Sequence, residues 1–187
     1  MAVDKICGIE TEYSIIHKGA EDQNPIWASS MLITSYVQDT EQGLENGIAD
    51  SVVWDFQDES PANDARGFAP IGSLPPIVET HLVNAVLTNG ARFYVDHAHP
   101  EMSTPECENA KEVARYDKSG EVILQEAMKS AKLLLPENEE LIVYKDNSDG
   151  KGNSYGCHEN YLMDRSTPFG DVIKHGIANF ITRQIYT

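Results

Sequence analysis

Polar and apolar side chains alternate along three segments of the chain, residues 6–16, 91–96 and 153–163. Successive side chains of a β-strand point to opposite faces, so this alternation predicts three strands. The less apolar faces carry Glu10, Glu12, Arg92, Tyr94, Asp96, Gly156, His158 and Asn160. Three strands whose polar residues gather on one face indicate a sheet with a site on that face, more strongly than any single strand does.

Apolar residues at helical spacing predict helices over residues 27–38, 77–87, 112–135 and from about residue 169 onward. Pro136 stops the third helix, and Ser119-Gly120 is a candidate break within it. Residues 141–145 form a further predicted strand. Residues 38–75 contain turn formers and acids with little periodicity, and a stretch of this length without regular structure is usually functional or disordered. We therefore expect a mobile loop at 38–75 that regulates access to the site.

Two acids stand close together on the first predicted strand. Glu10 and Glu12 lie roughly 7 Å apart on one face, where like charges repel. A divalent cation would relieve that repulsion, because hard cations such as Mg²⁺ bind carboxylate oxygens together with substrate phosphates. The alternative is an edge strand whose charges lie in water, and this strand alone does not decide between the two.

The second predicted strand combines three kinds of chemistry. Arg92, Tyr94 and Asp96 share one face, while Phe93 and Val95 face a core. A cation, a phenol and a carboxylate on one side of a half-buried strand are typical of a reaction site. A solvated sheet face is the alternative interpretation.

Composition narrows the class of protein. The formal charge of −16 disfavours nucleic-acid binding, which needs clustered lysine and arginine. No apolar run approaches the ~20 residues of a membrane helix. The three cysteines are widely spaced and odd in number, so a cytoplasmic location is expected. A cysteine nucleophile and a zinc site from His97, His99 and Cys107 are open alternatives.

Long motifs at residues 9–13, 89–101 and 154–162 resemble those of the Pup ligase/Pup deamidase family. Residues 54–61 and 64–68 resemble a loop that the deamidase/depupylase branch has and the ligase branch lacks. The resemblance covers nearly all of the chain. It implies an α+β, glutamine synthetase-like fold with a largely antiparallel sheet and helices packed on one face. Short strand connections agree with an antiparallel sheet.

The resemblance also implies roles for single residues. Asp96 matches the catalytic aspartate of the family. A Mg²⁺ ion under the nucleotide phosphates is expected at Glu10, Tyr94 and Glu101. The nucleotide, ATP, is expected to contact Arg92, Thr104, His158 and Asn160.

The implied activity is hydrolysis of an amide at the end of Pup, either the side-chain amide of its carboxy-terminal glutamine or its isopeptide bond to a lysine. Pup and pupylated proteins are therefore the expected partners, with no nucleic acid and no membrane. Asp96 would act as nucleophile or as general base for water, since a carboxylate can do either. One alternative is an ATP-dependent Pup–protein ligase. Another is a non-catalytic nucleotide-binding regulator, which the intact Asp96 argues against.

Family members look more than twice as long as these 187 residues, and the chain ends within its last predicted helix. We therefore expect residues 1–187 to be the amino-terminal part of a catalytic nucleotide-binding domain, whose carboxy-terminal remainder is absent. This part alone is expected to be inactive.

Overall fold

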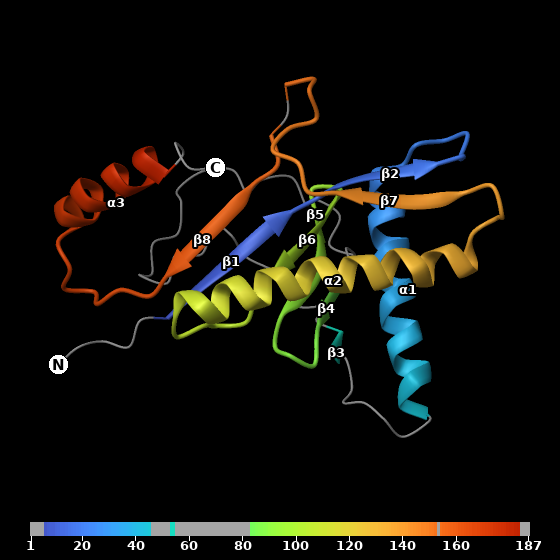
Figure 1. The fold of residues 1–187 in the computed structure, drawn as a ribbon, viewed down its shortest axis with the longest axis horizontal. Coiled ribbons are helices and arrows are strands. Elements are labelled where there is room, and N and C mark those ends of the chain that lie inside the picture. Colours follow the sequence, from blue (N-terminus) through green and yellow to red (C-terminus); the bar gives the residue numbers. More distant parts are fainter. Residues whose placement is uncertain (1–5, 46–52, 55–82, 153, 184–187) are drawn as a thin grey trace, which may run out of the picture.

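The computed structural model describes residues 6–45, 53–54, 83–152 and 154–183 (Figure 1). Within these residues the strands form a larger sheet of six and a separate pair. In chain order the elements are β1 (Cys7–Glu12), β2 (Ser14–Lys18), α1 (Pro25–Glu45), β3 (Val53–Trp54), β4 (Asn84–Val86), β5 (Arg92–Asp96), β6 (His99–Ser103), α2 (Ala110–Leu134), β7 (Glu140–Tyr144), β8 (Cys157–Tyr161) and α3 (Phe169–Arg183).

The larger sheet has the order β3-β4-β5-β6-β1-β8, and each neighbouring pair is antiparallel. Strand β1 therefore lies between β6 and β8, which follow it in the sequence by about ninety and one hundred and fifty residues. This arrangement confirms the predicted α+β fold with a largely antiparallel sheet. The second sheet pairs β2 with β7.

Helices α1 and α2 cross one another on the same side of the larger sheet (Figure 1). Helix α1 contacts β5 and β6, and α2 contacts β1 and β7. The core between these layers contains Leu32, Ile33, Val37, Phe93, Val95, Met102 and Leu124. Phe93 and Val95 are buried while Arg92, Tyr94 and Asp96 are half-buried, so the alternation read from β5 is confirmed. The prediction of helices on one face also holds for α1 and α2.

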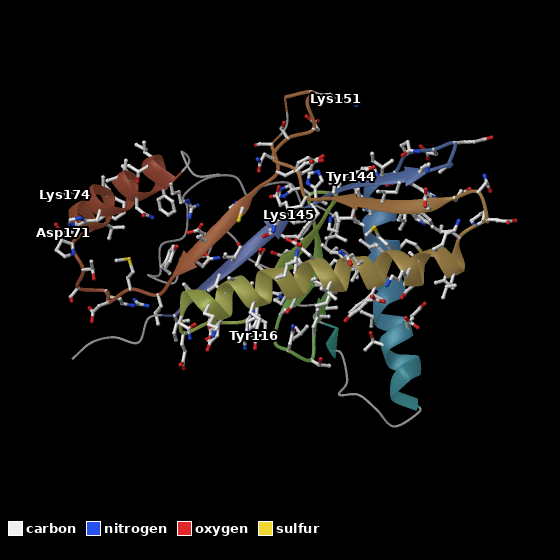
Figure 2. All side chains as sticks on the ribbon, viewed as in Figure 1. Tyr116, Tyr144, Lys145, Lys151, Asp171 and Lys174 are labelled. Carbon is white, nitrogen blue, oxygen red and sulfur yellow. The ribbon has the colours of Figure 1, made fainter. Side chains whose placement is uncertain are left out.

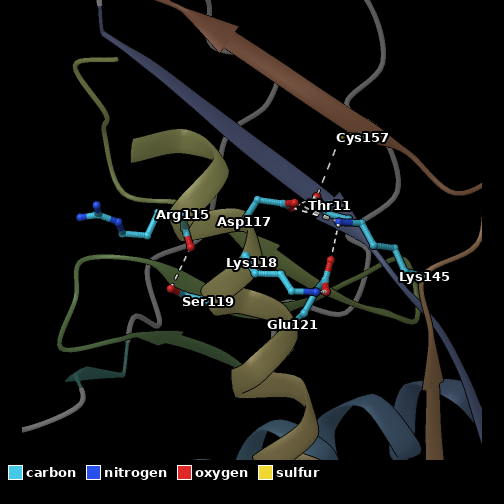
Figure 3. Close-up of polar contacts among 8 residues, drawn as sticks. All are labelled: Thr11, Arg115, Asp117, Lys118, Ser119, Glu121, Lys145 and Cys157. Atoms are coloured by element: carbon cyan, nitrogen blue, oxygen red, sulfur yellow. Dashed lines mark hydrogen bonds and ion pairs between the residues drawn. The ribbon is translucent and has the colours of Figure 1, made fainter. Parts of the chain in front are cut away.

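A group of charged side chains fixes α2 to the sheet (Figure 3). The Lys145 Nζ donates to Asp117 Oδ2 at 3.0 Å and to Glu121 Oε1 at 3.2 Å. The Thr11 hydroxyl donates to Asp117 Oδ1 at 3.4 Å. At the start of the helix, the Asn109 side chain accepts a hydrogen bond from the Glu112 N–H, as expected of an N-cap. Helix α2 is thus tied to β1 and to the chain leaving β7.

Helix α3 lies beyond β8, away from α1 and α2, as the labelled Asp171 and Lys174 show against Lys145 (Figure 2). None of its residues is buried. Five of its large apolar residues are exposed by 39–74%, namely Phe169, Ile173, Ile177, Phe180 and Ile181. Arg183 pairs with Glu159 of β8. No helix among the described residues combines the length and apolarity needed to cross a membrane.

The single strand predicted over residues 6–16 is wrong, because the chain divides at Tyr13 into β1 and β2. The Tyr13 N–H still donates to the Pro100 carbonyl of β6 at 3.0 Å. Beyond it the chain leaves the larger sheet to pair with β7. Alternation continues on both sides of the division, so the pattern alone does not mark it.

The helix predicted over residues 77–87 is also wrong where the structure describes it, since Asn84–Val86 is strand β4. Ala85 lies opposite Phe93, and both are fully buried. This pairing with β5 outweighs the local helical spacing. Residues 77–82 lie outside the described residues.

The candidate break at Ser119-Gly120 does not occur, because α2 runs through both residues. The other helices begin near their predicted starts, although α1 continues to Glu45. The predicted mobile loop at 38–75 is therefore wrong over residues 38–45, which are helical, and residues 53–54 form β3. The rest of that loop lies outside the described residues.

Candidate functional site

Two rows of polar side chains cross the sheet on the side opposite α1 and α2. Directly paired residues of neighbouring strands point to the same face, so the register defines the rows. The first row is Arg92, Ser103, Glu10 and His158, and the second is Tyr94, Glu101 and Glu12. The shared polar face predicted from three separate strands is therefore one continuous surface of four strands.

Glu101 is the most buried acid of this surface, with 3% of the residue exposed. Its Oε1 accepts a hydrogen bond from the Tyr94 hydroxyl at 2.6 Å, while its Oε2 is buried without a hydrogen-bond partner in the described part of the chain. Burial raises the pKa of Glu101 from 4.5 to about 7, helped by the charges of Asp96, Glu10 and Glu12 and opposed by the hydrogen bond from Tyr94. An orphaned buried carboxylate oxygen is a vacant acceptor for a proton or a cation.

Tyr94 is a neutral hydrogen-bond donor in this site. Burial and the hydrogen bond to Glu101 raise the pKa of Tyr94 above its usual range. Its oxygen also accepts a hydrogen bond from Ser103 Oγ at 3.1 Å. Tyr94 and Glu101 are both predicted metal-site residues, and the Tyr94 hydroxyl donates directly to the Glu101 carboxylate.

Glu10 and His158 face one another across β1 and β8. The Glu10 Oε2 lies 3.4 Å from His158 Nδ1. His158 was expected at the nucleotide, but it also lies within one group of possible metal ligands with Glu10 and Glu101, whose ligand atoms are all within 4.8 Å.

Glu12 is held by the backbone at the start of β8. The Gly156 N–H donates to Glu12 Oε2 at 2.7 Å, and the Glu12 N–H donates to the Gly156 carbonyl at 3.0 Å. Glu12 lies directly opposite Glu101. It forms a second group of possible metal ligands with Asp96 and Glu101, again within 4.8 Å.

Asp96 lies at the end of β5, where the chain turns into β6. Its Oδ1 lies 2.8 Å from His97 Nδ1, and its side chain is 39% exposed. His97 and Ala98 adopt φ values of 47° and 95°, which are uncommon for residues other than glycine. Strained turns of this kind concentrate at functional sites. Asp96 is thus accessible beside the buried Glu101.

The residues expected at the nucleotide lie along the first row and next to it. The Arg92 Nε donates to Asn84 Oδ1 at 3.3 Å, and its guanidinium lies 5.7 Å from the centre of the Tyr94 ring. Thr104 Oγ1 accepts a hydrogen bond from the Ile9 N–H at 3.1 Å. A hollow of about 370 Å³ is lined by residues that include Glu10, Ser103, Thr104 and Asn160. The structure brings Thr104 and Asn160 together there, whereas Arg92 is not among its lining residues.

The carboxylates of this surface repel one another, and a divalent cation bound between them would relieve that repulsion. Glu12 and Glu101 are directly paired like charges, an arrangement that destabilises a sheet unless something neutralises it. Hard cations take oxygen ligands of this kind. The zinc site considered for His97, His99 and Cys107 is not formed, since the described ligand groups contain neither those histidines nor a cysteine.

Sequence reasoning missed three parts of the site. The repulsion between Glu10 and Glu12 predicts a cation near both, but the metal site implied by the family resemblance omits Glu12, and the sequence predicts only a strand face for Gly156. The contact between Asp96 and His97 was not considered. The sequence does indicate the contact between Asp96 and His97, because a carboxylate followed by histidine in a tight hairpin turn places the two side chains near each other.

An antiparallel sheet with two helices on one side and rows of polar side chains on the other is an α+β domain, as the glutamine synthetase-like resemblance implies. The chain belongs to the Pup ligase family, because the profile of the family described as Pup-ligase protein matches residues 5–187.

Several known proteins are similar to this chain. It is 44% identical to a depupylase of Acidothermus cellulolyticus, covering 97% of this chain and 36% of that protein. It is 42% identical to a Pup deamidase/depupylase of Mycolicibacterium smegmatis, covering 99% of this chain and 37% of that protein. The crystal structure of the prokaryotic ubiquitin-like protein Pup with its ligase PafA matches with a TM-score of 0.65 and 26% identity, over 97% of this chain and 29% of that one. The chain thus spans little more than a third of the curated relatives' length.

Proposed function

We propose that this chain is the amino-terminal, nucleotide-binding part of a Pup deamidase/depupylase. Such an enzyme hydrolyses the side-chain amide of the carboxy-terminal glutamine of Pup and the isopeptide bond between Pup and a lysine. The observation that carries the proposal is the 44% identity to a depupylase along 97% of this chain. The three cysteines are free thiols, which supports placing the activity in the reducing cytoplasm.

Asp96 is the residue that acts on the amide. Its carboxylate is partly exposed, so a substrate can reach it, and it lies within 4.8 Å of ligand atoms of both Glu12 and Glu101. It attacks the amide carbon, or it takes a proton from the attacking water. His97 Nδ1, at 2.8 Å, holds the carboxylate in place, and the pKa of His97 is raised by its hydrogen bond to Asp96.

Glu10, Glu12, Glu101 and His158 are the residues that would hold Mg²⁺, because they belong to the two compact groups on the sheet face, whose remaining member is Asp96. ATP would lie along the first row and the hollow beside Thr104 and Asn160. Bound Mg²⁺ would supply positive charge at the acids and would orient the phosphates of the nucleotide. Tyr94 keeps its proton and fixes Glu101 Oε1, which leaves Glu101 Oε2 as the free acceptor.

The second candidate function is ATP-dependent ligation of Pup to protein lysines. It is favoured by the structural match to the ligase PafA and by 42% identity over 106 residues to a Pup–protein ligase of Nocardioides. That sequence match covers 54% of this chain, whereas the depupylase match covers 97%. The broader match favours hydrolysis.

The test uses a chimaera in which this chain replaces the matching segment of the Acidothermus depupylase. Pup ending in glutamine and a Pup–lysine conjugate are supplied separately with Mg-ATP, and ammonia, free Pup and ADP are measured. If the chimaera is a hydrolase, it should release ammonia from the first substrate and free Pup from the second. ADP should not form in proportion to either product. ADP formed in step with new conjugates would instead show a ligase. The chimaera with Asp96→Asn should lose both hydrolytic activities. The chimaera with Asp22→Asn, which changes an exposed loop aspartate, is its control.

A further inference from the structure

Gly156 lies so close to Glu12 that an added Cβ would force the Glu12 carboxylate to shift. A Cβ on Gly156 would lie 3.1 Å from Glu12 Oε1, 3.2 Å from Glu12 Cδ and 3.2 Å from His158 Nε2. The Gly156 backbone is not in the left-handed region. The absence of a side chain at this position therefore matters for the acid that packs against it, and not for the backbone conformation.

The contact between Gly156 and Glu12 is reciprocal. The Gly156 N–H binds the carboxylate through Oε2 at 2.7 Å, and the Glu12 N–H binds the Gly156 carbonyl at 3.0 Å. A backbone N–H that donates to a carboxylate forms a strong, charge-assisted hydrogen bond. Main chain and side chain of Glu12 are thus both fixed by one residue.

This double contact orients the carboxylate. With Oε2 taken by the Gly156 N–H, Oε1 is the Glu12 atom left for a ligand. Glu12 belongs to the group of possible ligands that also contains Asp96 and Glu101. Carboxylates that bind metals are usually oriented by hydrogen bonds of this kind, and losing such a partner typically costs about 10–100-fold in metal affinity. Glu12 cannot move away from a new methyl group without losing its bond to Gly156. His158, in contrast, is an exposed side chain that can turn away.

We infer that Gly156 is a positioning residue, which holds the Glu12 carboxylate in the orientation that binds the divalent cation. The inference rests on the cation site of the proposed function. Gly156 ends the segment between β7 and β8, so this segment would have the role of placing Gly156 beside Glu12.

The test measures Mn²⁺ affinity by electron paramagnetic resonance in the 187-residue chain. Four proteins form a cycle: the parent, Gly156→Ala, Glu12→Ala and the double variant. Gly170→Ala is the matched control, because a Cβ there meets no atom within 4 Å. Gly156→Ala is expected to weaken Mn²⁺ binding at least about tenfold, to keep the melting temperature of the control, and to cause no further loss in the Glu12→Ala background.

A second measurement does not depend on the metal. In the metal-free parent, the Gly156 amide proton should resonate downfield, as short bonds to carboxylates do, and Glu12→Ala should abolish that shift.

The outcomes separate this inference from the proposed function. An unchanged Mn²⁺ affinity in Glu12→Ala, or no binding by the parent, would overturn both the cation site and the positioning role. Loss in Glu12→Ala with parental affinity in Gly156→Ala would overturn the positioning role alone. So would an equal loss from Gly156→Ala in both backgrounds, since that result reports a general structural effect.

Discussion

At the scale of single residues, the surroundings of Glu101 favour its protonated form. It is nearly inaccessible to water, it lies opposite Glu12, and one of its oxygens has no hydrogen-bond partner among the described residues. Each of these conditions disfavours the charged carboxylate. Without a cation, the site therefore holds a proton on Glu101 at pH values where an exposed glutamate is ionised.

The raised pKa of Glu101 predicts a pH-dependent stability. Folding raises this pKa from 4.5 to about 7, so the folded chain binds the extra proton and loses stability as the pH rises through that window. Glu101→Gln removes the ionisation with little change of shape. In urea unfolding with EDTA, we expect the variant to exceed the parent by about 1–3 kcal/mol at about pH 8, and by much less at about pH 5.

The exposed Glu137→Gln is the control and should leave the free energy of unfolding unchanged at both pH values. An equal gain from Glu101→Gln at both pH values would contradict the prediction, because it would indicate a packing effect without titration.

Asp96 is expected to carry the chemistry and not the fold. It lies on the half-buried polar face of β5, opposite the buried Phe93 and Val95, so Asp96→Asn should leave the core intact. Asparagine is nearly isosteric but is neither a base nor a good nucleophile. In the depupylase chimaera we expect amide cleavage to fall by about 10²–10⁴-fold or more, with parental melting temperature and Mg-ATP affinity. Parental cleavage would refute the mechanism, and joint loss of stability and activity would favour a structural role.

Single-residue chemistry was predictable from the sequence only within one strand. Alternation assigned Glu10, Tyr94 and Asp96 to polar faces, and the register confirms that these faces are continuous. The opposition of Glu12 to Glu101 was not predictable, because it depends on the pairing of strands that are about ninety residues apart. The same holds for Gly156, whose role requires β8 to lie beside β1.

At the scale of elements, long amphipathic helices were predicted well and short strands poorly. Helix α2 has a strong periodic pattern, an N-cap and a terminating proline, and these local signals agree with its structure. Strand β4 is three residues long, and its neighbour β5 determines its conformation. The division at Tyr13 likewise depends on distant partners, since β2 pairs with β7.

The close approach of Met102 to Gly120 explains why a glycine lies at the centre of α2. A Cβ at this position would lie 2.9 Å from Met102 Cγ and 3.9 Å from the Tyr13 hydroxyl. Alanine favours a helix over glycine by about 1 kcal/mol, but overpacking a core costs about 1–3 kcal/mol. We therefore expect Gly120→Ala to lower the free energy of unfolding by about 1 kcal/mol, as measured in urea.

Gly176→Ala in α3 is the control for this substitution, because a Cβ there meets only Phe180 at 3.9 Å. It should not lower stability. A gain in stability from Gly120→Ala would contradict close packing of α2 on β6, since helix propensity would then outweigh any clash.

At the scale of the whole molecule, the net charge and the arrangement of the sheet both favour binding of a cation. The chain carries a formal charge of −16, and the sheet gathers acids on the side away from α1 and α2. Simple screening by salt weakens repulsion between exposed charges. It does little for a pair such as Glu12 and Glu101, where one member is buried, so a bound cation should do more than salt.

Divalent cations are therefore expected to stabilise the chain specifically. A ligand present at about 100 times its Kd adds about 2.7 kcal/mol, which for a chain of this size corresponds to a rise of about 5–10 °C in melting temperature. We expect saturating Mg²⁺ to produce such a rise, and NaCl of equal ionic strength to produce much less. The double variant Glu10→Gln/Glu12→Gln should remove the difference between the salts, because it removes two ligands of the acid rows. Equal rises with MgCl₂ and NaCl in the parent would show that the acids are merely screened.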